Sequence, residues 1–100
     1  SSNRLKFLHS KLFNSSILIN LVLNNNQIES IENDTFKFCS LSLREFHIES
    51  NNLKSILNGY FSQARNLVNL NLKRNQISRI ESDSFRFQQR LINLDLSDNA

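Results

Sequence analysis

The chain has no proline, methionine or tryptophan, and it has one glycine, Gly59, and one cysteine, Cys39. Because glycine and proline are the usual turn residues, the turns of this chain need another residue type. A single cysteine cannot form a disulfide within the chain. Clusters of cysteine and histidine with metal-ligand spacing are also missing, so we expect no metal and no cofactor.

Long apolar runs and runs of like charge are absent too. No segment approaches the roughly eighteen apolar residues of a membrane span, and the stretch SSNRLKFLHSKLF lacks the apolar core of a signal peptide. Twelve Lys and Arg against nine Asp and Glu give a net charge of +3, with no four consecutive like charges. Nucleic-acid-binding surfaces are typically clustered basic patches, so nucleic acid is not the favoured partner.

Asparagine is abundant instead, with sixteen residues. Five of them recur at positions 3, 26, 51, 75 and 99, with spacings of 23, 25, 24 and 24 residues. Apolar residues keep a constant register to these asparagines, and around Asn75 they are Leu67, Leu70, Leu72, Ile77, Ile80 and Phe85. A period of this length predicts a solenoid, in which each unit buries its apolar face against its neighbours.

The spacing within one unit excludes a long amphipathic helix, which requires apolar residues three and four positions apart. Leu70-Asn71-Leu72 alternates as a half-buried strand does, and the alternation ends at Lys73. Each unit is therefore predicted to contain one short strand, a bend and an irregular return. The predicted units are a partial repeat at 1–17, repeats at 18–42, 43–66 and 67–90, and a partial repeat at 91–100, and we expect them to be part of a longer repeat domain.

These units resemble a known family. The segments LINLVLNNNQI at 18–28 and LVNLNLKRNQI at 67–77 are similar to the leucine-rich repeat (LRR) pattern LxxLxLxxNxI. IESIENDTF and ISRIESDSF resemble the extension of the 24-residue class common in extracellular proteins. The resemblance covers almost the whole chain and implies an α/β solenoid, a horseshoe segment with a parallel concave sheet, a mostly irregular convex side and few or no regular helices.

Three features of this solenoid can be predicted from the residues. An inward asparagine can satisfy backbone groups that lose their partners where the chain bends, so we expect a structural asparagine ladder of Asn26, Asn51, Asn75 and Asn99. Four phenylalanines should stack in a column near the opposite wall: Phe13, Phe36, Phe61 and Phe85. The second repeat has one extra residue in KFCSLSL, which should form a bulged convex loop.

The alternation points the remaining strand residues outward, onto the concave face, where LRR proteins commonly bind partners. The candidate ligand-binding residues are Asn20, Val22, Asn24, Glu45, His47, Glu49, Asn69, Asn71, Lys73, Arg74, Asp95 and Ser97. Their charges alternate in stripes from strand to strand, which favours a partner of complementary pattern. The alternative is that they are the ordinary polar cover of an exposed sheet.

No group of residues predicts catalysis, and we expect no enzyme. A cysteine nucleophile needs a neighbouring base, but His9 and His47 fall in other repeats and on other faces than Cys39. His47 lies between Glu45 and Glu49 along one strand face, which is either a contact that responds to pH or a solvated charged row.

The resemblance to Toll-type receptor ectodomains and secreted LRR immune proteins implies a protein-binding module with an extracellular location, either secreted or in a receptor ectodomain. A protein ligand or co-receptor is the implied partner, beside neighbouring LRR units of the parent chain. Two sequons, at Asn14 and Asn33, are candidate glycosylation sites and support secretion mildly. The alternatives are a structural spacer in a larger LRR ectodomain or cell-adhesion protein and, motivated by Lys73 and Arg74, a nucleic-acid sensor.

Overall fold

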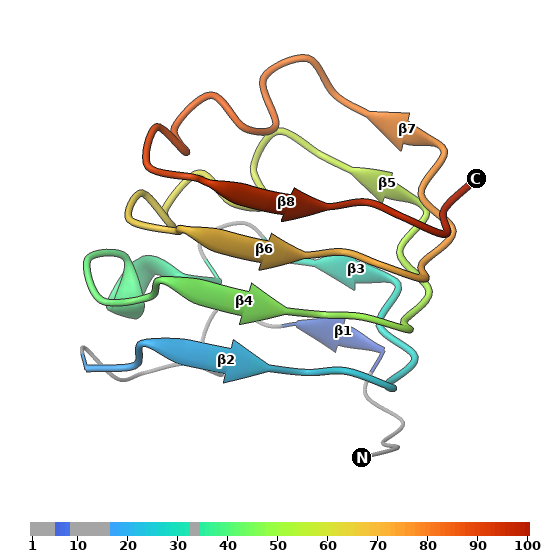
Figure 1. Ribbon diagram of the computed structural model, residues 1–100, viewed down its shortest axis with the longest axis horizontal. Coiled ribbons are helices and arrows are strands. Elements are labelled where there is room, and N and C mark those ends of the chain that lie inside the picture. The colour runs from blue at the N-terminus through green and yellow to red at the C-terminus, as the bar shows by residue number, and fades with distance from the viewer. Residues whose placement is uncertain (1–5, 9–16, 33–34) are drawn as a thin grey trace.

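The computed structural model describes residues 6–8, 17–32 and 35–100, and these residues form a stack of coils (Figure 1). Each coil contributes one strand to a four-stranded parallel sheet with the order β2-β4-β6-β8. The strands are β2 (Asn20–Val22), β4 (Glu45–His47), β6 (Asn69–Asn71) and β8 (Asn93–Asp95). Leu21, Phe46, Leu70 and Leu94 are in register across the sheet. The structure confirms the predicted parallel solenoid.

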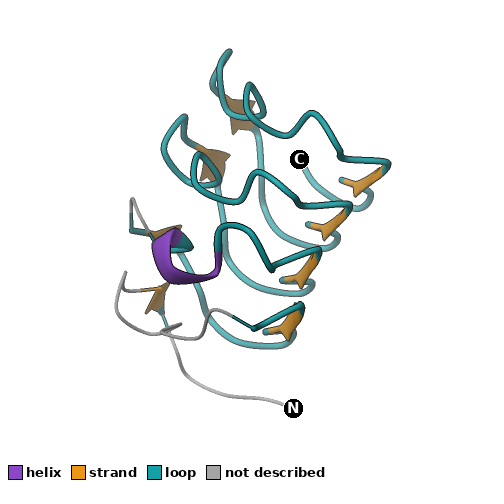
Figure 2. Ribbon diagram, turned by 90° about the vertical axis from the view of Figure 1, so that its left-hand side faces the viewer, coloured by secondary structure: helices purple, strands orange, loops and turns teal. Residues whose placement is uncertain are grey.

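A second row of short strands lies on another side of the coils (Figure 2). In this row β1 (Phe7–Leu8) pairs with β3 (Ser30–Ile31), and β5 (Ser55–Ile56) pairs with β7 (Arg79–Ile80), all parallel. Each of the last three strands begins four residues after a ladder asparagine. The sequence did not predict these strands. They form because the coils are stacked at one spacing and because the β-branched isoleucines favour extended backbone.

The extra residue of the second repeat is accommodated in the predicted convex loop. The loop contains the 3₁₀ helix η1 (Lys37–Cys39), the only helix in the described part of the chain. A further turn follows, in which the Cys39 carbonyl accepts hydrogen bonds from the amides of Ser42 and Leu43 at 3.1 and 3.0 Å. Leu43 is fully buried after this turn. The insertion therefore leaves the register of the next strand unchanged.

The phenylalanine column forms as predicted where the structure describes it. The ring centroids of Phe36 and Phe61 lie 6.2 Å apart, and those of Phe61 and Phe85 lie 5.9 Å apart, both pairs stacked. Phe13 lies outside the described residues. Phe46, which replaces a leucine in its strand, packs edge-on against Phe36 at 5.1 Å and Phe61 at 6.2 Å. The larger ring thus joins the sheet to the column.

The repeating asparagines lie inside the coils and connect each coil to the one before it. Asn75 Nδ2 donates to the Ile48 carbonyl and to the Leu72 carbonyl, both at 3.1 Å, and Asn75 Oδ1 accepts from the Leu53 amide at 3.1 Å. The side chain is 7% exposed, so its partners are backbone groups shielded from water. One amide therefore satisfies groups of two successive coils.

The other ladder asparagines form similar hydrogen bonds. Asn51 Oδ1 accepts from the Ile28 amide at 3.1 Å, and Asn99 Oδ1 accepts from the Ile77 amide at 2.9 Å. Asn26 is buried and donates to the carbonyl of its own strand end, Leu23, at 3.0 Å. The residue that matches Ile28 one repeat earlier is Leu5, which lies outside the described residues.

The residue before each ladder asparagine has left-handed backbone conformation. The φ angles of Asn25, Ser50, Arg74 and Asp98 lie between 55° and 60°. Left-handed backbone is uncommon outside glycine, and asparagine and aspartate tolerate it best. Its recurrence at one position of every coil shows that this turn bends the chain away from the sheet and aims the next side chain inward. The equal spacing of Asn25 and Asp98 from the ladder was the sequence signal for it.

A second buried polar row precedes the phenylalanine column. Thr35 Oγ1 donates to the Leu8 carbonyl at 3.3 Å, and Ser84 Oγ donates to the Ile56 carbonyl at 2.8 Å. Tyr60 occupies the equivalent position between them and is buried. Side-chain donors on both sides of the coil therefore satisfy carbonyl groups of the preceding coil.

The ladder geometry predicts a large stability effect for Asn75→Ala. The change leaves the Leu53 amide and a share of the Ile48 and Leu72 carbonyl hydrogen bonds without partners in a buried setting. We expect the free energy of unfolding to fall by about 2–4 kcal/mol, measured by urea denaturation. The control is Asn52→Ala, because the Asn52 side chain forms no hydrogen bond within the described residues. Equal effects of the two changes would contradict the structural role of the ladder.

Candidate binding surface on the concave sheet

The outward side chains of the four parallel strands form one polar surface, called the concave face here. Along β4, Glu45 and His47 point outward and are partly exposed, whereas Phe46 between them is fully buried. The parallel register aligns outward residues across the strands in two rows: Asn20, Glu45, Asn69 and Asn93, then Val22, His47, Asn71 and Asp95. The structure thus places the candidate strand residues together on one face.

A shallow hollow of about 430 Å³ lies on this face over β4, β6 and β8. Its polar lining is His47, Asn69, Asn71, Asn93 and Asp95, and its apolar lining is Leu70 and Leu94. Asn93 Nδ2 donates to Asn69 Oδ1 at 2.5 Å, which ties the two amides together across neighbouring strands. The hollow offers donors and acceptors around a small apolar area, as binding surfaces commonly do.

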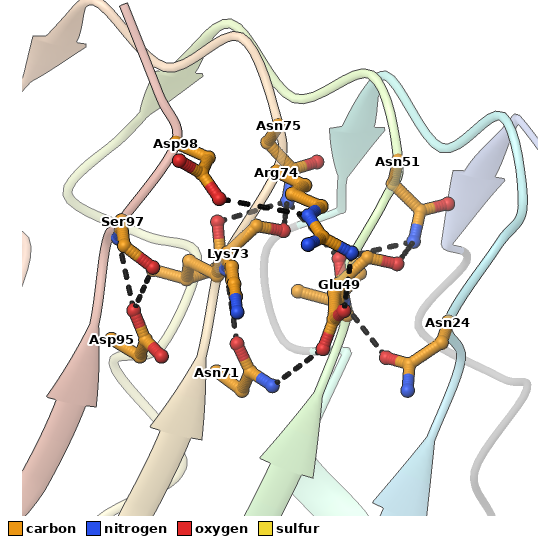
Figure 3. A network of polar contacts seen from close by, with 12 residues as sticks. Asn24, Glu49, Asn51, Asn71, Lys73, Arg74, Asn75, Asp95, Ser97 and Asp98 are labelled. Atoms are coloured by element: carbon orange, nitrogen blue, oxygen red, sulfur yellow. Dashed lines mark hydrogen bonds and ion pairs between the residues drawn. The ribbon is translucent and has the colours of Figure 1, made fainter.

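Glu49 is the centre of a polar network at the end of the strands (Figure 3). Its Oε1 accepts from Asn71 Nδ2 at 3.1 Å, and its backbone amide donates to Asn24 Oδ1 at 2.8 Å. Arg74 Nη1 lies 3.7 Å from Glu49 Oε2. One residue therefore links the ends of β2, β4 and β6 and fixes the side chains that flank the hollow.

Arg74 belongs to the predicted basic stripe and forms ion pairs with residues of both neighbouring acidic stripes. Besides its pair with Glu49, Arg74 Nε lies 3.6 Å from Asp98 Oδ2. These pairs are exposed or half-exposed, so each contributes little to stability. Their effect is on the surface potential, because the basic stripe is partly neutralised by the acidic residues on both sides. Lys73 remains the cation of this stripe that forms no ion pair among the described residues.

His47 contacts one carboxylate and not two. Its Nε2 lies 3.3 Å from Glu45 Oε1. Glu49 is directed toward Asn71 and Arg74 instead. Among the described residues, the predicted position of the imidazole between two carboxylates is therefore not found, because Glu49 is bound by cross-strand partners.

Asp95 is held by the residue two positions later. Asp95 Oδ1 accepts from Ser97 Oγ at 2.6 Å and from the Ser97 amide at 2.9 Å. The hydrogen bond from the Ser97 side chain lowers the pKa of Asp95 most, and the one from the Ser97 amide lowers it further. The positive charge of Lys73 also lowers this pKa, by a smaller amount. Asn71 makes the same turn one coil earlier, where its Oδ1 accepts from the Lys73 amide at 3.0 Å. The side chains of Asn71 and Asp95 are thus oriented by hydrogen bonds to residues two positions later in the chain.

Cys39 lies in the convex loop, apart from His47 on the concave face. Cys39 is 1% exposed, and burial raises the pKa of its thiol, which disfavours the thiolate that a nucleophile or metal ligand requires. The described residues contain no group of three or more His, Cys, Asp or Glu side chains that could hold a metal ion.

Three candidates lie outside the described residues, namely the sequon asparagines Asn14 and Asn33 and the histidine His9. In the part of the chain that the structure describes, no helix is both long and apolar enough to cross a membrane.

The geometry agrees with the comparison to known proteins. The leucine-rich repeat family model matches residues 41–100, more than half of the chain. The chain belongs to the leucine-rich repeat family. No curated protein matches the sequence.

Several solved structures are similar to this chain, and one of them matches over nearly its full length. It is a chain of the Toll–Spatzle complex, described as a molecular hub in Drosophila development and innate immunity. The TM-score is 0.91 and the sequence identity is 31%. The match covers 99% of this chain and 13% of that chain, so this chain spans a small part of its structural neighbour.

The hydrogen bonds of Asp95 predict a pH effect for Ser97→Ala. Without the Oγ donor, the pKa of Asp95 should rise toward its ordinary value of 3.8. A carboxyl group whose pKa is lower in the folded than in the unfolded chain stabilises the folded state at pH values above its unfolded-state pKa. This stabilisation is lost as the pH falls through the folded-state pKa. The variant should therefore be less stable than the parent at neutral pH, and the difference should vanish in acid. NMR titration of the carboxyl group measures the shift, with Ser82→Ala as the exposed control that leaves it unchanged.

Burial of Cys39 predicts slow thiol chemistry. At pH 8 we expect the native chain to react with a disulfide reagent such as DTNB about a hundredfold more slowly than the same chain in urea, because the reagent needs an accessible thiolate. The rate across a urea series should follow the unfolding transition seen by circular dichroism. A fast, complete reaction of the native chain would show that the convex loop opens independently of the core.

Proposed function

We propose that this chain is a non-enzymatic protein-recognition module of an extracellular LRR protein, a receptor ectodomain or a secreted immune factor, and that it binds through the concave face. The main support is the hollow over β4, β6 and β8, where amide, imidazole and carboxylate groups from three strands surround a small apolar area. The family and the structural neighbour from a complex with a protein partner support the same class of function.

The polar groups around the hollow are held in place before any partner arrives. Asn71 is bonded to Glu49 on one side and to the Lys73 amide on the other, and Asp95 is bonded to Ser97. Preorganised side chains lose less conformational entropy on binding than free ones. This order supports a binding role over that of a layer of independently solvated side chains.

The charge distribution favours a protein partner over a nucleic acid. Arg74 is shared between Glu49 and Asp98, and Asp95 lies beside the hollow. A polyanion would meet these carboxylates, and repulsion would offset the attraction of Lys73. A protein surface with both signs of charge can complement this pattern.

The experiment uses purified Spatzle, the protein named with the structural neighbour, as the probe. We expect Asn69→Arg, which fills the hollow, to weaken binding by about tenfold or more, measured by surface plasmon resonance. The matched control is Ser82→Arg, which adds the same charge at an exposed position of the loop after β7 and should change the affinity less than about twofold.

Binding that survives Asn69→Arg would show that the concave face is not the recognition surface and would favour a structural spacer. Equal losses in both variants would mean that added charge, and not the filled hollow, weakens the complex.

A further inference from the structure

The loops that lead into β6 and β8 lie on the edge where the chain enters the concave strands (Figure 1). They carry a cluster of three arginines and one phenylalanine: Arg65 in the first loop, and Arg86, Phe87 and Arg90 in the second. Arg65 Cζ lies 5.0 Å from the centroid of the Phe87 ring, and Arg86 Cζ lies 5.6 Å from it. The ring is 37% exposed. Cation–π contacts of this kind hold guanidinium groups in place at the surface.

The charges of this cluster are not compensated. In the described part of the chain, Arg65, Arg86 and Arg90 form no ion pair, whereas Arg74 and Arg79 each pair with a carboxylate. Like charges gathered on one ring repel one another, and a bound anion relieves this repulsion. The cluster therefore gathers three arginines without ion pairs among the described residues on two neighbouring loops.

A hollow of about 230 Å³ adjoins the ring. Its lining is Arg65, Asn66, Phe87, Gln89 and Arg90, with no carboxylate among these residues. Asn66 Nδ2 donates to the Leu41 carbonyl at 2.9 Å, so its amide is oriented by the preceding coil. Guanidinium and amide donors around one hollow match the oxygen atoms of an oxyanion, which the planar arginine fork binds through paired hydrogen bonds.

We propose that this arginine–phenylalanine pocket, formed by Arg65, Asn66, Phe87, Gln89 and Arg90 with Arg86 beside it, binds the sulfate esters of a sulfated polysaccharide. The basic groups come from two successive coils, so a linear polyanion can run along the stack and place charges on both. Arg44, exposed and one residue before β4, adds a cation on the coil before these two.

Single-stranded nucleic acid fits the pocket less well. Proteins that bind it stack its bases on aromatic side chains, and here Arg65 and Arg86 already cover the Phe87 ring. A sulfated polysaccharide needs no ring for stacking, because its charged groups are recognised by hydrogen bonds and by electrostatic attraction. The pocket is also lined by none of the residues of the concave hollow, so the two sites can be occupied independently.

The test compares heparin fragments, the same fragments after removal of their sulfate groups, an oligo-dT strand and poly-glutamate, by isothermal titration calorimetry at several salt concentrations. The variant R65Q/R90Q removes two charges from the pocket. We expect it to weaken heparin binding by about tenfold and to reduce the dependence of affinity on salt. The control K6Q/K54Q removes two exposed charges outside both candidate sites and should change the heparin affinity less than about twofold.

Three results would overturn the proposal. Unchanged heparin affinity in R65Q/R90Q would exclude the pocket, and an equal loss in the lysine control would reduce the effect to net charge. Binding of desulfated fragments, oligo-dT or poly-glutamate as tight as that of heparin would exclude selectivity for sulfate esters. Thermal unfolding of each variant shows that a loss of binding is not a loss of fold.

Discussion

The buried asparagine amide that bridges two coils is the interaction on which this fold depends. A solenoid must turn its backbone out of the sheet once per coil, and each turn leaves amide and carbonyl groups without sheet partners in the interior. Asn51 and Asn75 fill both needs at once, since each amide donates to strand-end carbonyls and accepts from a backbone amide of the preceding coil. The strands, the column of rings and the outer surface keep their positions because this bend is repeated.

The surface chemistry follows from the same repetition. Because the coils are in register, side chains at equivalent positions form rows, and cross-strand partners decide what each row presents. Glu49 contacts Asn71 and Arg74 on the next coil, so it holds these side chains in place instead of contacting His47. On the other edge Arg65 and Arg86 lie against Phe87 and form no ion pair in the described part of the chain. The same stack of coils thus presents one surface with both signs of charge and one basic surface.

The sequence predicted what depends on the period and on polarity. The parallel sheet, the inward asparagines, the column of Phe36, Phe61 and Phe85, and the outward positions all follow from residue spacing, because a repeat places each residue type at one point of the coil. Side-chain pairing between coils was not predictable, since it depends on rotamers across strands. The ring contacts of Arg65 were missed for this reason. The left-handed turn was missed for another reason: Asn25 and Asp98 indicate it, but Ser50 and Arg74 at the same position do not favour it.

The short turn of η1 shows where the chain tolerates a change in length. One additional residue is taken up there, and the following strand still joins the sheet with Phe46 facing inward. An insertion between a strand and its ladder asparagine cannot be accommodated in this way, because it would move the side-chain amide away from the backbone groups of the coil to which it is hydrogen-bonded. Family members built on this plan should therefore diversify through their outer loops or by gaining and losing whole coils.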